Sequence, residues 1–268
     1  MMFNVEHISV LDDPSEWCRQ LLSPEGLSPE LVADFTAKVE ALISSCKGME
    51  GQSIKVIFTG RHGQSLHNLL AIQHGGYDQA HIVQPVVDPP LTDAGQEQTR
   101  AIGINLQKAC ERGLREPEVH FTSPLTRCCQ TMFNEWGWCA VPSQTLSATF
   151  IEGLREHLIL HDWNRRRSLS RLKENWPTYV VPSDMTEADQ LFLAQWEMGR
   201  DETEEELLAR TSVALQHILH ASEGKTYISV TSHSGAIRGL QNAANAPRND
   251  LKPGELVPLV IRVTEKCG

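Results

Sequence analysis

Four short stretches of the chain carry side chains that could bind a phosphate group and transfer it. The stretches are Arg61–Ser65 with Asn68, Ser123–Arg127, Leu154–His157 and Thr231–Gly235. Between them they hold arginine, histidine and glutamate side chains. Arginine binds phosphate through paired hydrogen bonds, histidine can attack phosphorus, and a carboxylic acid can protonate a leaving oxygen. The residue types therefore predict a phosphoryl-transfer site.

The expected strands and helices place three of these stretches at the carboxyl ends of strands. Residues 54–59 form a short apolar run rich in β-branched residues that stops at Gly60, which is typical of a buried strand. Further strands are expected at 119–122, 146–150, 227–231 and 257–263, and helices at roughly 93–112, 125–136, 187–198, 203–221 and 234–244. The alternation predicts an α/β fold, in which a mainly parallel central sheet is flanked by helices on both faces.

Residues 1–50 are expected to form a helical N-terminal extension packed on the core, and residues 51–268 to form the main domain. Helices are expected at 14–22 and 28–45. Apolar residues of the second helix fall at helical spacing, so they form one face that can pack against the main domain.

Composition and charge indicate a globular protein that does not bind polyanions. Of the 268 residues, 40% are hydrophobic and 22% charged, a balance that supports a core and excludes a disordered chain. The formal net charge of −10 disfavours binding to nucleic acid or to an anionic membrane. The seven cysteines are irregularly spaced, so we expect reduced thiols. The sequence shows no signal-peptide pattern and no apolar run of about 18 residues, from which we expect a cytoplasmic location.

Taken together and in this order, the four stretches resemble the histidine phosphatase, or phosphoglycerate mutase-like, superfamily. The resemblance spans about residues 54–264. It includes Asp88–Gly95, which is similar to a Leu-Thr-x-x-Gly helix start, and Phe121–Arg127, which is similar to an arginine loop. Residues 154–168 most resemble the fungal broad-range phosphatase branch. The resemblance implies a phosphoglycerate mutase-like fold and a phosphohistidine intermediate.

The resemblance also implies a role for each residue of the phosphate pocket. His62 is the expected nucleophile, and Arg61 and Arg127 are expected to bind the nonbridging phosphate oxygens. His233 resembles the second histidine of the pocket, and backbone N–H groups at the helix start after it would add to anion binding. Gln64 departs from the glutamate frequently found after Arg-His-Gly, a change that bears on the subgroup more than on catalytic competence.

The leaving oxygen needs a proton, and Glu156 is the candidate general acid because it occupies the position that resembles the family's acid loop. Asp162 is the substitute candidate for this role. Glu152 is expected to be structural.

Other residues are candidates for holding the substrate. By resemblance, Asn68 hydrogen-bonds the bound phosphate, and Ser234, beside His233, is a further substrate-binding candidate. The basic run that contains Arg165 and Arg166 is commonly a solvated face or a set of ion pairs. Alternatively, one of these arginines binds a second phosphate or a carboxylate on the substrate, because the run follows the acid loop.

These observations predict a metal-independent phosphatase that hydrolyses a small-molecule phosphate monoester and requires no cofactor. Phospho-His62 would form first, and water would then release the phosphate. A phosphomutase or a diphosphatase could use the same phosphohistidine, and a non-catalytic phosphate-binding module is a further alternative. The expected partner is a phosphorylated small molecule, with neither nucleic acid nor membrane involved.

Overall fold

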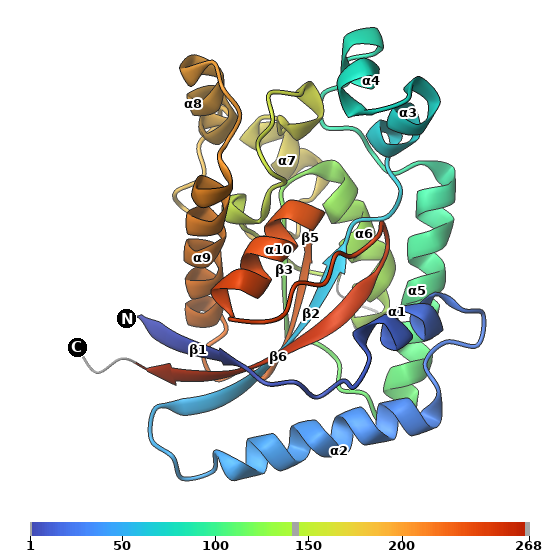
Figure 1. Ribbon diagram of the computed structural model, residues 1–268, viewed down its shortest axis with the longest axis vertical. Helices are drawn as coiled ribbons and strands as arrows, with labels where there is room; N and C mark the ends of the chain where they lie inside the picture. The colour runs from blue at the N-terminus through green and yellow to red at the C-terminus, as the bar shows by residue number, and fades with distance from the viewer. Residues whose placement is uncertain (1, 141–144, 266–268) are drawn as a thin grey trace.

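The centre of the fold is a six-stranded sheet with the order β1-β6-β2-β5-β3-β4. The computed structural model describes residues 2–140 and 145–265, and Figure 1 shows their arrangement. The strands are β1 (Phe3–His7), β2 (Gln52–Arg61), β3 (Val119–Thr122), β4 (Thr149–Phe150), β5 (Tyr227–Ser232) and β6 (Leu256–Glu265). Neighbours among β2, β5, β3 and β4 pair in parallel, whereas β6 is antiparallel to both β1 and β2. The predicted, mostly parallel sheet is confirmed.

Helices cover both faces of this sheet, as the α/β pattern predicted. Their bounds are α1 (Pro14–Leu22), α2 (Pro29–Ser45), α3 (Leu66–His74), α4 (Tyr77–Val83), α5 (Asp93–Glu111), α6 (Thr126–Trp136), α7 (Leu169–Asn175), α8 (Gln190–Met198), α9 (Glu204–Ala221) and α10 (Ser234–Ala243). Val56 and Phe58 of β2 belong to one hydrophobic cluster with α1, α2, α5 and α6, and Ile57 belongs to another with α9 and α10. Because side chains alternate along a strand, β2 is buried on both faces at Val56–Phe58, where its sequence is continuously apolar.

The N-terminal segment contributes to the same core. The side chains of Asp13 and Ser28 accept backbone N–H groups at the starts of α1 and α2, which lie where the sequence predicted helices. Trp17 and Phe35 are buried with ring centroids 5.0 Å apart, in the cluster that contains Phe58. The sequence did not predict β1, an edge strand of five residues that pairs with β6. So short an alternation of half-buried and exposed residues gives little signal.

Three short helices were also not predicted. These are α3, α4 and α7, of nine, seven and seven residues. Ile72 of α3 and Ile82 of α4 are more than 70% exposed, so the apolar residues of these helices do not follow a single buried face. The strand expected at 146–150 is limited to Thr149–Phe150. Figure 1 shows α3 and α4 at the end of the molecule toward which β2 runs.

The described cysteines are all free thiols, in agreement with the sequence-based expectation. Cys267 lies outside the described residues, together with residues 266 and 268 of the expected main domain. Within the described part of the chain, no helix combines the length and the apolar character needed to cross a membrane.

Candidate active site

His62 and His233 meet where two neighbouring parallel strands end. Arg61, the last residue of β2, lies opposite Ser232, the last residue of β5. The His62 backbone N–H donates to the Ser232 carbonyl at 3.0 Å. The two imidazole rings follow these strand ends, with centroids 5.0 Å apart, and both are almost completely buried. The structure therefore brings together the two histidines that the sequence singled out.

His62 is held as a neutral imidazole with one nitrogen available for attack. Its Nδ1 lies 2.8 Å from the carbonyl oxygen of Gly63, which can only accept, so Nδ1 carries the proton and Nε2 the lone pair. Burial, and then the charges of Arg127 and Arg61, hold the pKa of His62 well below its usual value. A neutral imidazole with a free lone pair is the form of histidine that can attack phosphorus.

Two arginines beside these histidines have N–H groups that no described residue accepts. Arg127 is fully buried; its Nη1 donates to the Trp163 carbonyl at 2.9 Å, while Nε and Nη2 have no partner among the described residues. Arg61 Nη1 donates to the Leu251 carbonyl at 2.8 Å, and its buried Nε likewise has no described partner. A buried donor without an acceptor costs about 1–3 kcal/mol, and more when charged. The arrangement is therefore suited to an anion that supplies acceptors.

Asp88 fixes the start of the helix that carries Arg127. Its Oδ1 accepts the backbone N–H of Thr126 at 2.8 Å, and its Oδ2 accepts the Thr126 hydroxyl at 2.7 Å. Burial raises the pKa of Asp88, and the hydrogen bonds from Thr126 and the charge of Arg127 oppose this rise. Asp88 thus caps the first turn of α6 from a distant segment, which orients Arg127.

Glu156 is anchored at the start of α10, directly after His233. Its Oε1 accepts backbone N–H groups of Gly235 at 2.9 Å and of His157 at 2.8 Å. Its Oε2 accepts the Ser234 hydroxyl at 3.2 Å. These donors fix the predicted acid beside the predicted second histidine. They also give Ser234 a partner within the chain.

His233 has protein partners on the side facing α6. Its Nε2 lies 2.9 Å from the Ser123 hydroxyl and 3.3 Å from the Cys128 sulfur. Burial, followed by the charge of Arg127, holds the pKa of His233 well below its usual value. A bound dianion would counter that positive charge and favour the protonated ring.

Asn68 belongs to the same region, where its amide also ties α3 to α4. Its Oδ1 accepts the Ser65 backbone N–H at 3.1 Å and the Ser65 hydroxyl at 2.9 Å. Its Nδ2 donates to the Tyr77 hydroxyl at 3.1 Å and lies 3.2 Å from His67 Nε2. Both amide hydrogens therefore have partners in the chain, and a phosphate bound by Asn68 would replace one of them.

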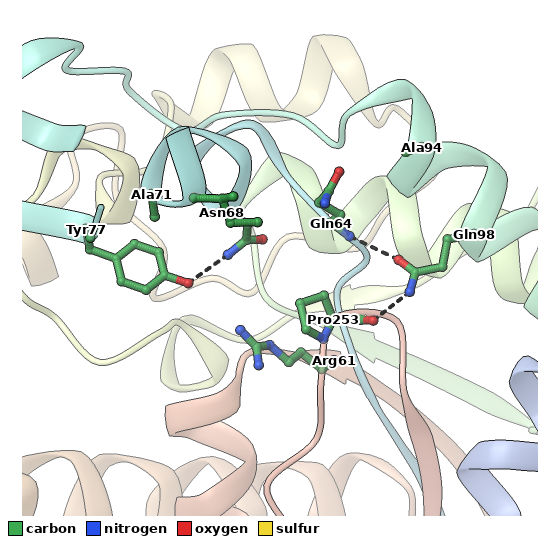
Figure 2. A pocket seen from close by; sticks show the side chains of 10 residues that line it. Arg61, Gln64, Asn68, Ala71, Tyr77, Ala94, Gln98 and Pro253 are labelled. Atoms are coloured by element: carbon green, nitrogen blue, oxygen red, sulfur yellow. Dashed lines mark hydrogen bonds between the residues drawn. The ribbon is translucent and has the colours of Figure 1, made fainter. Parts of the chain in front are cut away.

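A pocket of about 780 Å³ opens beside Arg61. Figure 2 shows Tyr77 with its hydroxyl directed at Asn68, and Gln98 bridging Gln64 and Pro253. The lining is Arg61, Gln64, Asn68, Ala71, Ile72, Gly76, Tyr77, Ala94, Gln98 and Pro253. Among the described residues, no three His, Cys, Asp or Glu side chains gather as a metal site requires.

Comparisons with known proteins agree with this geometry. A model of the histidine phosphatase superfamily (branch 1) matches residues 57–258. The chain belongs to this superfamily. A probable phosphoglycerate mutase of Arthroderma benhamiae is 29% identical over 217 residues. The match covers 78% of this chain but only 63% of that protein, which is less than two thirds of its length.

Two further relatives extend this picture. A probable phosphoglycerate mutase of Saccharomyces cerevisiae is 28% identical over 249 residues, and the match covers 81% of each chain. The crystal structure of phosphoglycerate mutase from Bacillus anthracis is 15% identical, with a TM-score of 0.52 over 81% of this chain and 94% of that one. This last likeness shows that the histidine phosphatase chain has a phosphoglycerate mutase-like fold.

The histidine phosphatase motifs did not point to three aromatic residues beside the nucleophile. The ring centroid of His67 lies 5.7 Å from that of His62, and His67 stacks on Trp163 at 5.7 Å. Tyr77 lies 5.8 Å from His67. Burial and the charge of Arg127 lower the pKa of His67 well below its usual value. The place of His67 in the same stretch as His62 was a usable signal, whereas Tyr77 and Trp163 join the site only through folding.

The structure does not place the two candidate arginines of the basic run in the pocket lining. The Arg166 side chain is almost fully buried, where it pairs with Glu152 and donates to the carbonyls of Thr186 at 2.7 Å and Ala188 at 3.0 Å. Arg165 is exposed and is not among the residues that line the pocket beside Arg61. The contacts of Arg166 are those of a structural residue, because internal acceptors already occupy its guanidinium.

Another buried arginine, Arg155, holds the acid loop in place. Arg155 contacts both oxygens of Asp189, at 2.5 and 2.9 Å. Asp189 also accepts the backbone N–H groups of Arg166 at 2.8 Å and Phe192 at 3.0 Å. The ion pair therefore joins the residue before Glu156 to the start of α8. The sequence-based expectation gave no role to Arg155, although it stands within the Leu-Arg-Glu motif.

Proposed function

We propose that this protein is a metal-independent phosphatase that hydrolyses a small-molecule phosphate monoester through phospho-His62. The observation that carries the proposal is the state of His62: a buried, neutral imidazole with Nε2 unprotonated, beside two arginines with unused donors. Membership of the histidine phosphatase superfamily supports the same chemistry.

The first half-reaction transfers the phosphoryl group to the enzyme. Arg61, Arg127 and His233 bind the nonbridging oxygens and stabilise the charge that the transition state redistributes. The His62 Nε2 lone pair forms the N–P bond as the P–O ester bond breaks. Glu156 gives its proton to the departing alkoxide, which leaves as a neutral alcohol.

The second half-reaction restores the enzyme. Water enters in line with the N–P bond and loses a proton to the Glu156 carboxylate as it attacks phosphorus. The N–P bond then breaks and its electron pair returns to Nε2. Inorganic phosphate leaves, and both His62 and Glu156 have regained their starting protonation states.

A phosphomutase is the second candidate, favoured by the description of two relatives as probable phosphoglycerate mutases. It would share the first half-reaction and return the phosphoryl group to another hydroxyl. Release of inorganic phosphate in the presence of a sugar acid, without an isomeric phosphate ester, would distinguish the phosphatase from it. The opposite product pattern would establish the mutase.

The first test compares wild type, His62→Ala and a control, His220→Ala, with p-nitrophenyl phosphate in EDTA. His220 is an exposed histidine on α9. We expect wild type and His220→Ala to release nitrophenolate and form an acid-labile phosphoenzyme, and His62→Ala to do neither. Equal activity of His62→Ala and wild type would refute the mechanism. Inactivity of all three would refute hydrolysis of a simple monoester.

A further inference from the structure

The pocket beside Arg61 is built almost entirely from uncharged groups. Arg61 is the single charged residue among the described residues that line it. The remaining polar groups are the amides of Gln64, Asn68 and Gln98 and the hydroxyl of Tyr77. A carboxylate or second phosphate placed here would meet amide and hydroxyl groups without a cationic partner of its own.

Two lining side chains are already held in place by neutral hydrogen bonds. Gln98 accepts the Gln64 backbone N–H at 3.2 Å and donates to the Pro253 carbonyl at 2.7 Å. Gln64 Oε1 accepts the Thr92 hydroxyl at 2.9 Å. The wall that these contacts form is therefore largely preorganised, and it offers dipoles rather than charges.

Charges around the pocket do not compensate for its neutral lining. Asp93 and Glu97 lie next to Ala94 and Gln98 in α5 and are exposed. Lys252, next to Pro253, is also exposed, and its backbone N–H donates to the Glu255 carboxylate. These three neighbours bring two carboxylates and one ammonium group, so they add no net positive charge to the neutral lining.

The α3 and α4 side of the pocket adds apolar surface. Ala71 and Ile72 of α3 line the pocket together with the ring of Tyr77, and Ile72 is 72% exposed. Apolar surface beside amide and hydroxyl groups suits a ligand that has both hydrocarbon and hydroxyl groups. The volume of about 780 Å³ exceeds what a phosphate group alone requires and is within the range of small-molecule pockets.

We propose that this pocket binds the alcohol portion of the substrate, and that this alcohol is uncharged and about the size of a sugar or larger. The inference rests on the proposed function only in taking Arg61 as a ligand of the transferred phosphate. The substrate class is then a phosphate monoester of a neutral polyhydroxy or ring-containing alcohol. Phosphorylated sugar acids and bisphosphates are disfavoured, because their second anion would lose hydration without gaining a partner.

A matched pair of esters tests this preference. Sorbitol 6-phosphate and 6-phosphogluconate are open-chain monoesters of the same length that differ by a hydroxymethyl group and a carboxylate at the far end. Titration calorimetry with His62→Ala measures their dissociation constants without turnover. We expect the sorbitol ester to bind about 10- to 100-fold more tightly, the loss expected for a poorly solvated carboxylate.

A charge added to the wall provides the matched control. Ala94 lines the pocket and is exposed. In the His62→Ala background, Ala94→Lys should reduce the preference for the sorbitol ester by at least about threefold, whereas Ala94→Gln should leave it within about twofold. A similar effect of both substitutions would overturn the electrostatic explanation.

Competition by the same two esters against wild-type turnover of p-nitrophenyl phosphate gives the ratio independently of the His62→Ala variant. Equal affinity, tighter binding of 6-phosphogluconate, or binding of neither ester would overturn the inference even when wild type hydrolyses p-nitrophenyl phosphate. If wild type does not hydrolyse that compound but the sorbitol ester binds preferentially by calorimetry, the proposed phosphatase activity fails and the neutral pocket stands.

Discussion

Replacing Asp189 with asparagine should lower the free energy of unfolding more than removing a charge from an exposed residue. Asp189 is 6% exposed and Arg155 is fully buried, so water cannot replace the lost carboxylate at the guanidinium. The carboxylate accepts two hydrogen bonds from Arg155 and one backbone N–H each from Arg166 and Phe192. Asp189→Asn removes the buried carboxylate and leaves the Arg155 guanidinium paired with the partly exposed Glu152 at 3.1 Å, a change that should cost about 3–5 kcal/mol.

The loss should be measured as the free energy of unfolding in urea at constant pH. For a chain of this size, 3–5 kcal/mol corresponds to a fall in Tm of roughly 6–20 °C. Asp184→Asn is the matched control, since Asp184 is exposed in the same segment, and should change stability by less than about 0.5 kcal/mol.

A double substitution separates two contributions to the lost stability: the Arg155 charge without its Asp189 partner, and the altered packing. Arg155→Met with Asp189→Leu removes both charges, so we expect it to be more stable than Asp189→Asn alone, as buried pairs replaced by apolar residues often are. Equal stability of Asp189→Asn and Asp184→Asn would refute this reasoning. A double variant less stable than Asp189→Asn would show that the lost backbone hydrogen bonds and the shape of the site, rather than the Arg155 charge, dominate.

Three further results are expected. Glu156→Gln should slow phosphoenzyme formation from an alkyl phosphate by about 10²–10⁴-fold, but much less from p-nitrophenyl phosphate, whose phenolate needs no proton. Glu135→Leu should raise unfolding free energy near pH 8 by about 1–3 kcal/mol, because both carboxylate oxygens of Glu135 are buried without a described partner. The pKa values of His62, His67 and His233 are lowered in the folded protein, so below about pH 6.5 the unfolded chain binds more protons than the folded one. Stability should therefore fall with decreasing pH by up to about 1.4 kcal/mol per pH unit for each of these histidines. His67→Gln should reduce this slope.

A different outcome would contradict each of these three predictions. Equal slowing with both phosphate esters would remove Glu156 as the acid. Burial raises the pKa of Glu135, so the unfolded chain releases this proton at lower pH than the folded protein does. Stability should therefore decline as pH rises above about 4.5. A Glu135→Leu variant with the same decline would contradict this assignment. A wild-type pH slope unchanged by His67→Gln would show that His67 titrates alike in both states.

Strands β2, β3, β5 and β6 and most long helices could be predicted because their signals are local. The run at 54–59 is buried on both faces, and β3 begins and ends where the sequence placed it, at Val119–Thr122. By contrast, α3 and α4 depend on contacts with each other and with a distant segment, because Leu70 of α3 and Ala80 of α4 are buried together with Trp163. A helix of seven to nine residues has too few turns for its pattern to predict it alone.

By itself, the sequence determined the type of chemistry: arginine and histidine at the ends of predicted strands, with a glutamate between them along the chain. It did not determine the environment of each group, because burial and hydrogen bonding depend on segments far apart in sequence. Tertiary structure made Arg127 a fully buried cation with unused donors and turned Arg166 inward to Glu152. It also set neutral side chains from α3, α4 and α5 around one pocket, and the electrostatics of a site follow from which groups are brought together and how far water is excluded.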